Sequence, residues 1–254
     1  MFKYAIVKTP ASTLTAGITA SPELGAPDYA KALEQHQTYI RALEACGVGV
    51  TVLDPDENFP DSCFIEDVAV CTRAFAMVTR PGARSRMGEQ EDTAAVLSGF
   101  YDHIEQITAP GTLEGGDVMM VKDHYYIGLS DRTNREGAAQ LIAALSAHGM
   151  DGSMVEMSDM LHLKTGLSYL EENILLAAGE FKNKKEFRSF DMIEIPEEES
   201  YAANCIRVND YVIVPEWFPK TRKLIEDAGL KTMAVDTSEF RKLDGGLSCL
   251  SLRF

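Results

Sequence analysis

The sequence predicts an α/β fold in which five similar units close into a ring. A pattern of strand, loop, two further strands and helix recurs along the 254 residues. The last copy stops short, and the strand and helix that it lacks stand at the N-terminus. Pairing of the two chain ends would complete the ring and leave no open sheet edge. Because one unit alone could not bury its apolar face, we expect residues 1–254 to form a single domain.

The N-terminal part supplies a strand at 2–10 and a helix at 28–47. Apolar residues that recur at helical spacing give this helix one face to bury. The face is formed by Tyr29, Leu33, His36, Ile40 and Leu43.

The first complete unit has its strand, loop, strand pair and helix at 49–53, 54–66, 67–83 and 88–100. The corresponding elements of the second unit are at 103–107, 108–115, 116–132 and 133–149. In the second helix, Thr133 and Glu136 have the spacing of a capping box, and Gly149 is placed to end the helix.

The third unit is shorter, with a strand, a loop and a further strand segment at 153–157, 158–165 and 166–181. The fourth is complete, with its elements at 191–195, 196–203, 204–218 and 219–229. The fifth has a strand, a loop and a last strand at 231–235, 236–245 and 246–254. The N-terminal strand and helix complete this fifth unit.

An ordinary doubly wound sheet is the alternative fold for alternating strands and helices. Such a sheet places helices between most of its strands. The strand–turn–strand segment 117–128 has no helix between its two strands and therefore favours the ring.

The composition limits the classes of partner that the protein is expected to bind. The net charge of −15 argues against nucleic acid or an anionic membrane and favours a small cationic substrate. An acidic surface that only confers solubility fits the charge equally well. The sequence contains no run of about 18 apolar residues and no signal-peptide pattern, so we expect a cytoplasmic protein. The five cysteines form no CxxC pair, which predicts neither a structural zinc site nor a disulfide framework.

Polar side chains gather in the loops that should meet at one end of the ring. In chain order these loops carry Asp61 and Glu66, Glu114, His162, Glu197–Glu199 and Cys249. A thiolate is a nucleophile, a histidine exchanges protons near neutral pH, and carboxylates pair with a planar guanidinium. The combination predicts a thiol enzyme that acts on a small cation.

Each residue also has a structural explanation. Cys249 could be an inert thiol in an apolar strand, His162 a core histidine, and Glu114 the start of a turn. Cys63 is a rival thiol in the acidic loop, unless strand alternation turns it away from the cavity. The joint placement of a thiol, an imidazole and a carboxylate favours the catalytic interpretation.

Five segments resemble the dimethylarginine dimethylaminohydrolases, especially the bacterial type. They read FPDSCFIED, TLEGGDVMMV, LHLKTGLSYL, IPEEESYAANC and DGGLSC, and the likeness covers essentially the whole chain in order. The family belongs to the guanidino-group-modifying (pentein) superfamily, so the resemblance implies a five-fold α/β propeller. It also implies hydrolysis of Nω,Nω-dimethyl-L-arginine, and of the monomethyl form, to L-citrulline and dimethylamine or methylamine.

The resemblance also implies roles for individual residues. Cys249 would be the nucleophile that forms a covalent thiouronium intermediate, His162 the acid and base, and Glu114 the group that holds the histidine or polarises the guanidinium. The implied substrate contacts are Asp61, Glu66 and Asp67 on its nitrogen groups, Arg86 and Arg132 on its α-carboxylate, Ile18 in a lid, and Leu243 before the nucleophile.

The resemblance implies neither a metal nor another cofactor, and it suggests a homodimer by analogy alone. Inhibition by zinc is a hypothesis, because a Cys–His pair can trap this ion. The alternatives are an arginine deiminase or another hydrolase of the superfamily, a non-enzymatic binding propeller, and an interaction surface at 196–200. Typical deiminases carry an added helical domain, for which 254 residues leave no room.

Overall fold

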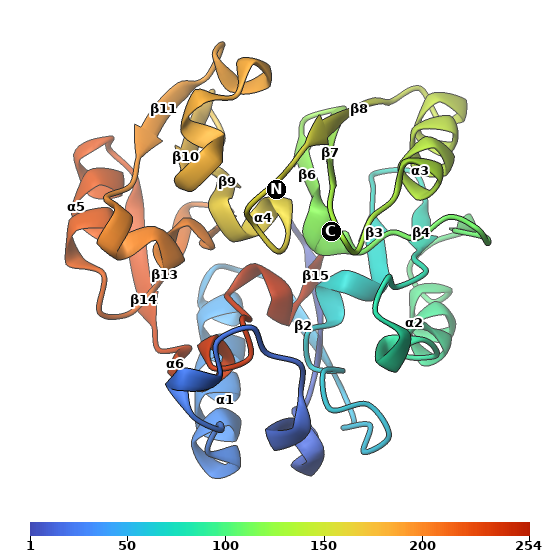
Figure 1. Ribbon diagram of the computed structural model, residues 1–254, viewed down its shortest axis with the longest axis horizontal. Helices are drawn as coiled ribbons and strands as arrows, with labels where there is room; N and C mark the ends of the chain where they lie inside the picture. The colour runs from blue at the N-terminus through green and yellow to red at the C-terminus, as the bar shows by residue number, and fades with distance from the viewer.

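Five three-stranded sheets surround a common axis in the computed structural model, which describes residues 1–254 (Figure 1). The strands are β1 Tyr4–Lys8, β2 Gly49–Leu53, β3 Ala69–Cys71, β4 Ala76–Val78, β5 Ile104–Gln106, β6 Val118–Val121, β7 His124–Leu129, β8 Asp151–Glu156, β9 Leu167–Tyr169, β10 Ile174–Ala177, β11 Asp191–Glu194, β12 Ile206–Val208, β13 Tyr211–Pro215, β14 Lys231–Val235 and β15 Leu252–Arg253. The helices are α1 Tyr29–Ala45, α2 Gln90–Leu97, α3 Arg135–Ala147, α4 Leu163–Gly166, α5 Pro219–Asp227 and α6 Ser238–Arg241. None of these helices is long and apolar enough to cross a membrane.

Every sheet has the same internal order. An antiparallel hairpin such as β3–β4 is followed by a parallel third strand such as β5, which the chain reaches through helix α2. Parallel neighbours require a crossover of this kind, whereas antiparallel neighbours need only a tight turn. The third strand of each sheet is therefore the strand that opens the next unit of the sequence pattern. Each sheet therefore takes strands from two successive units of the sequence pattern, and the predicted α/β propeller is confirmed.

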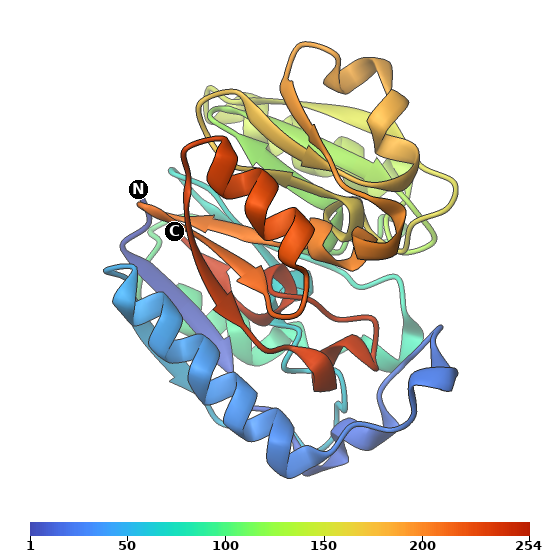
Figure 2. The same cartoon turned by 90° about the vertical axis from the view of Figure 1, so that its left-hand side faces the viewer.

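The two chain ends complete one sheet together. Strand β1 pairs antiparallel with β15, with Ala5 opposite Arg253, and parallel with β2 on its other side. The amide of Tyr4 donates to the carbonyl of Phe254 over 2.8 Å. The termini lie side by side in both ribbon views, at one end of the ring (Figure 2). The predicted closure of the ring by its own ends is confirmed.

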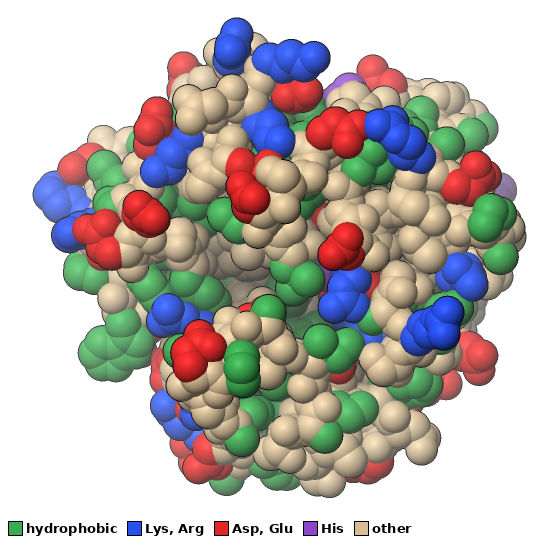
Figure 3. Space-filling view, viewed as in Figure 1, with side chains coloured by type: hydrophobic (Ala, Val, Ile, Leu, Met, Phe, Trp, Pro, Cys, Tyr) green, Lys and Arg blue, Asp and Glu red, His purple; other side chains and the backbone are tan.

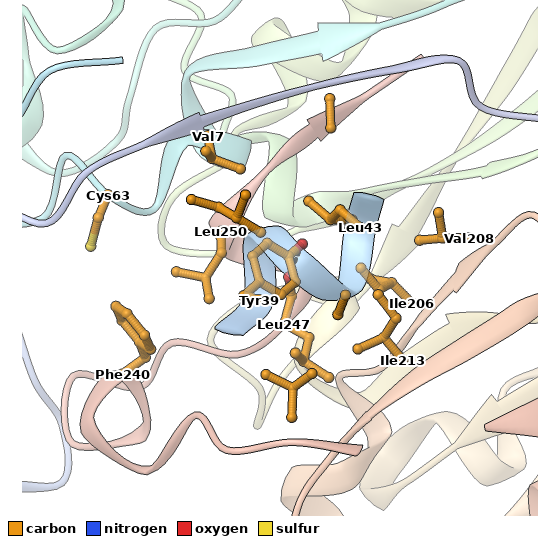
Figure 4. Close-up of a cluster of buried hydrophobic side chains, with 14 of the residues drawn as sticks. Val7, Tyr39, Leu43, Cys63, Ile206, Val208, Ile213, Phe240, Leu247 and Leu250 are labelled. Carbon is orange, nitrogen blue, oxygen red and sulfur yellow. Dashed lines mark hydrogen bonds between the residues drawn. The ribbon is translucent and has the colours of Figure 1, made fainter. Parts of the chain in front are cut away.

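Helix α1 packs against the sheet that carries the C-terminal segment (Figure 4). His36, Ile40 and Leu43 of its predicted face are buried, whereas Tyr29 and Leu33 are only partly covered. Tyr39 is also fully buried in this cluster, and its hydroxyl donates to the Leu247 carbonyl over 2.9 Å. The helix therefore anchors the chain two residues before Cys249.

Two local predictions need correction, and one unit departs from the common pattern. Asn134, and not Thr133, caps α3, because its side chain accepts the amide of Gly137. The third unit has 3₁₀ turns at Gly179–Asn183 and Lys185–Phe187 between β10 and β11, where the other units have a helix. The last strand is only β15, so Cys249 lies in a 3₁₀ turn, Ser248–Leu250, and not in a strand. Gly149 does end α3, with a left-handed φ of 70°.

Candidate active site

A cavity of about 130 Å³ is lined in part by the segment before α1, which lies at the end of the ring opposite the chain ends (Figure 2). The space-filling view shows this face hollowed near its centre, with basic and acidic side chains at the rim (Figure 3). The predicted site residues that line the cavity are Ile18, Asp61, Asp67, Arg86, Glu114, Arg132, His162, Leu243 and Cys249. Because they come from loops far apart in the sequence, only the closed ring brings them together.

Cys249 lies on the cavity wall, partly exposed, in the turn that follows Gly245 and Gly246. The amide of Gly246 donates to its sulfur over 3.4 Å. Desolvation of the thiol, together with the charges of Glu66 and Asp67, raises the pKa of Cys249 to about 12. Without a cation in the cavity, the thiol is therefore protonated at neutral pH.

His162 and Glu114 form a buried pair across the cavity floor. The histidine Nε2 lies 2.8 Å from Glu114 Oε2, and the amides of Gly82 and Ala83 donate to the other carboxylate oxygen. Burial opposes the charge on His162, but Asp67, Asp117 and Glu114 outweigh it and raise its pKa to about 9.

The pair is an ion pair at neutral pH. Burial favours the neutral form of Glu114, yet its hydrogen bond with His162, the histidine's charge, and Arg86 and Arg132 lower its pKa to about 2. The site therefore holds a proton on an imidazole next to a cavity, as an acid that serves a leaving group requires.

Asp67 connects this pair to the neighbouring loop. One of its oxygens accepts the amide of Gly116 over 2.9 Å, and the other accepts Arg86 Nη1 over 2.6 Å. A β-carbon on Gly116 would lie 2.8 Å from both Asp67 Oδ1 and His162 Nδ1. The glycine therefore permits the carboxylate and the imidazole to approach each other.

The two predicted arginines differ in their surroundings. The Arg86 guanidinium is buried and donates to Asp67, Glu89 and the carbonyls of Asp61 and Phe64. The Arg132 side chain is partly exposed and makes no hydrogen bond or salt bridge with the protein. Arg132 is thus the cation whose donors are available to a ligand in the cavity.

The segment before α1 covers one side of the cavity. The amide of Ile18 donates to Asp61 over 3.0 Å, and the amide of Ala20 donates to Asp244. The Ser21 hydroxyl adds a bond of 2.8 Å to the same Asp244 carboxylate. Ile18, Thr19 and Ala20 line the cavity, so this segment has the position of a lid.

Comparison with known proteins identifies the family. A family model described as N,N dimethylarginine dimethylhydrolase, eukaryotic, matches residues 27–249. The sequence is 60% identical to the N(G),N(G)-dimethylarginine dimethylaminohydrolase of Pseudomonas aeruginosa over 255 residues, which cover 100% of both chains. The chain belongs to the dimethylarginine dimethylaminohydrolase family. A relative of the same name from Streptomyces coelicolor is 34% identical over 252 residues, or 99% of this chain and 96% of its own.

Solved structures of this family match the whole chain. A cysteine-to-serine variant of the P. aeruginosa dimethylarginine dimethylaminohydrolase, complexed with citrulline, superimposes with a TM-score of 0.99 at 59% identity and covers 100% of both chains. A histidine-to-glycine variant as an adduct with S-methyl-L-thiocitrulline gives a TM-score of 0.98, also at 59% identity and with 100% of both chains covered. The N-terminal domain of ArgZ, a cyanobacterial arginine dihydrolase, gives 0.90 at 19% identity over 100% of this chain and 97% of its own, which shows the fold alone.

Glu66, which the family resemblance places on the substrate, does not line this cavity. Its carboxylate pairs with Lys164 over 2.7 Å and with Arg253 over 2.8 Å, and it accepts the Ser248 hydroxyl over 2.7 Å. It lines a second cavity, of about 140 Å³, that also contains Phe2 and Arg253. In the structure Glu66 therefore lies beneath the Cys249 turn, and its contact with a substrate stays a prediction from the sequence.

The acidic loop of the fourth unit and the rival thiol also lie elsewhere. Glu199 accepts the amides of Lys220 and Thr221 at the start of α5, so the predicted convergence of Glu197–Glu199 on the site was wrong. Cys63 is fully buried in the core beneath α1. Its thiol, whose pKa burial raises well above the usual value, is not presented to the cavity.

Two residues near Cys249 were missed from the sequence. Asp244 binds the lid, and Asn204 contacts the Cys249 turn. Asp244 stands beside the predicted Leu243, but only its left-handed φ of 58° turns it toward the lid. Asn204 lies within a quoted family segment, and no spacing rule relates it to a turn that is more than forty residues away.

The cavity also contains a group of donor atoms suited to a cation. Asp67, Glu114 and His162 each offer one such atom within 4.8 Å of the others. In the structure these groups pair with Arg86 and with one another. A metal would have to compete with those pairs and with the proton on His162.

Proposed function

We propose that the protein hydrolyses Nω,Nω-dimethyl-L-arginine, and the monomethyl form, to L-citrulline and dimethylamine or methylamine. One observation carries the proposal. Cys249, His162 and Glu114 come from three different units and line one cavity that is acidic beside the thiol. The identity of 60% to a named dimethylarginine dimethylaminohydrolase over the whole chain supports this substrate class.

The substrate itself would activate the nucleophile. Desolvation, together with the charges of Glu66 and Asp67, holds the Cys249 thiol in its protonated form when the cavity lacks a cation. A guanidinium in the cavity offsets these negative charges and favours the thiolate, which then attacks the guanidinium carbon. A cationic substrate is therefore both the reactant and the counter-charge.

His162 would serve both half-reactions. The C–N bond to the dimethylamino group breaks, its electron pair leaves with nitrogen, and the protonated histidine supplies the proton. The neutral imidazole then takes a proton from water, whose oxygen adds to the carbon of the thiouronium. Collapse breaks the C–S bond and returns the electron pair to sulfur, which takes up the remaining hydroxyl proton as citrulline is released. Glu114 holds the imidazole in place throughout.

The remaining contacts would orient the amino-acid end and the nitrogen groups. Asp61 and Asp67 are the carboxylates for substrate nitrogens, and Arg132 is the available partner for the α-carboxylate. Arg86 also lines the cavity and would act largely through Asp67, to which it donates. Ile18 closes over the substrate, and Leu243 contributes to the wall before Cys249.

A comparison of substrates tests the proposal. Purified protein is expected to form citrulline from dimethylarginine far faster than from arginine. Faster turnover of unmethylated arginine would reassign the protein to a deiminase, and absence of turnover of either would favour a binding protein. A homodimer and a cytoplasmic location stay predictions from the sequence.

The covalent step needs its own experiment. Cys249→Ser should abolish citrulline formation, and Cys63→Ser, at the buried rival thiol, should leave it close to the parent value. Mass spectrometry of acid-quenched parent enzyme should detect the substrate-derived adduct on the peptide that contains Cys249. Full activity of Cys249→Ser would exclude the mechanism.

A further inference from the structure

Asn204 lies between the fourth unit and the nucleophile. It follows the 3₁₀ segment Glu197–Ala203, precedes β12 and is 6% exposed. Its side-chain oxygen accepts the Ser248 amide over 2.8 Å, and its nitrogen donates to the Ser248 hydroxyl over 3.2 Å. The same nitrogen lies 3.8 Å from Cys249 Sγ, within the range of a hydrogen bond to sulfur.

The orientation of this amide follows from its partners. A backbone N–H can only donate, so the atom that faces the Ser248 amide must be the Asn204 oxygen. The Ser248 hydroxyl donates to Glu66 over 2.7 Å and therefore accepts from Asn204. The two hydrogens of the amide nitrogen are thus divided between the serine oxygen and the cysteine sulfur.

A second donor meets the sulfur from the backbone. The Gly246 amide lies 3.4 Å from Cys249 Sγ. A β-carbon at Gly246 would lie 2.5 Å from the Asn204 side-chain carbon, so the glycine leaves room for this amide. The two donors converge on a sulfur whose thiolate form is disfavoured by desolvation and by the negative charges of Glu66 and Asp67.

We propose that Asn204 donates a hydrogen bond that stabilises the Cys249 thiolate and holds the Ser248–Cys249 turn in its reactive position. The proposal rests on Cys249 being the nucleophile of the proposed function. Negative charge is present on sulfur before attack and returns to it when the C–S bond of the thiouronium adduct breaks. A fixed hydrogen-bond donor next to the sulfur lowers the free energy of the thiolate at both points of the reaction, because the donor does not have to reorient.

Alkylation of Cys249 by iodoacetamide tests the proposal without any substrate. Only the thiolate reacts, so at a fixed pH below the thiol pKa the rate measures the thiolate fraction. Mass spectrometry assigns alkylation to the peptide that contains Cys249. In Asn204→Ala the rate at pH 8 is expected to fall about tenfold, the effect of losing one charge-assisted hydrogen bond. In Asn204→Asp it should fall further, because a carboxylate replaces the donor.

Asn134→Ala is the matched control. Asn134 also holds backbone amides through its side chain, at the start of α3, and does not contact Cys249. This variant should lose stability yet alkylate at the parent rate. Steady-state kinetics add a second readout. Asn204 does not line the cavity, so Asn204→Ala should lower kcat by about tenfold and change KM less than about twofold.

Parent-like alkylation in a folded Asn204→Ala or Asn204→Asp variant would overturn the proposal, whatever the substrate proves to be. If Asn204→Ala does not fold, Asn204→Asp retains the oxygen that accepts the Ser248 amide and decides the question alone. Slow alkylation together with no turnover of any methylated arginine by the parent would support Asn204 as a thiolate donor and reject the proposed function.

Discussion

His162 and Glu114 stabilise the fold over a defined range of pH. The folded pKa of His162, about 9, lies above its ordinary 6.5, so its contribution is complete below 6.5 and is lost as pH rises through 9. The folded pKa of Glu114, about 2, lies below its ordinary 4.5, so its contribution is complete above 4.5 and is lost as pH falls toward 2. Both contributions are complete only between these ordinary values, from pH 4.5 to 6.5.

Glu114→Gln should lower the pKa of His162, because it removes the charge that lies 2.8 Å from Nε2. NMR titration of the imidazole should give a midpoint below 9, and the alkaline limb of the kcat profile should move in the same direction. Glu105→Gln is the control, since Glu105 pairs with the peripheral His148 over 2.9 Å. An unchanged His162 midpoint would show that Glu114 does not set it.

His36 is a weak point of the core. It is fully buried, neither ring nitrogen has a hydrogen-bond partner, and burial lowers its pKa to about 4. Because its folded pKa is below its unfolded one, the fold loses stability as pH falls from 6.5 toward 4. His36→Leu should therefore stabilise the protein, by about 2 kcal/mol more at pH 5 than at pH 8. Urea unfolding at both pH values measures the difference, and an equal gain at both would contradict the assignment.

Which side chains face the cavity was predictable only in part. Cys249, His162 and Glu114 converge because the order of strands and loops brings their loops to one end of the ring. Glu66 and Asp67 are adjacent in a 3₁₀ turn, yet Asp67 faces the cavity and Glu66 faces the other side of the turn. The pattern of apolar residues does not determine how such a turn directs two neighbouring carboxylates.

At the scale of elements, the lid is held mainly by carboxylates. Asp61 binds the Ile18 amide, and Asp244 binds Ala20 and Ser21. Asp244→Ala should release residues 18–21, which would raise their amide hydrogen exchange and increase KM about tenfold. Asp244→Asn, which tolerates the left-handed φ and keeps one acceptor, should be intermediate. Unchanged exchange at residues 18–21 in Asp244→Ala would show that this carboxylate does not hold the lid.

Elements with a clear period were predicted well, and short turns were not. Helices α1, α3 and α5 lie within the predicted ranges, and in α1 the prediction rested on apolar residues that recur at helical spacing. The segment around Cys249 was expected to lie in an apolar strand at 246–254. Gly246 and the hydrogen bond that the Ser248 amide donates to Asn204 instead favour a turn. Asn204 is more than forty residues away, so this contact leaves no signature in the local sequence.

At the scale of the whole molecule, the pairing that closes the ring supports both the stability of the fold and the geometry of the candidate site. Deletion of Leu252–Phe254 would leave β1 without its antiparallel partner and Glu66 without Arg253. We expect the free energy of unfolding to fall by at least about 3 kcal/mol and citrulline formation to be lost. Phe254→Ala is the control, because it retains the carbonyl that accepts the Tyr4 amide.

Denaturant unfolding followed by fluorescence and by circular dichroism measures both variants. Coincident single transitions in the parent protein would support the prediction of one domain. Parent-like stability after the deletion would show that the stability of the ring does not depend on the pairing of β1 with β15.

The offset between the sheets and the units of the sequence pattern has a consequence for gene recombination. A sheet becomes complete only when the strand that opens the next sequence unit has been added, as β5 completes the sheet of β3 and β4. One sheet takes strands from both chain ends, so only an exchanged internal block with two crossovers keeps every sheet intact. Both crossovers must then fall in loops between sheets, and among these loops only the one between β11 and β12 contributes no residue to the cavity. At least one crossover therefore falls in a loop that carries residues of the candidate site, such as Glu114 or His162. Working chimeras between distant relatives would need parents that agree in that loop.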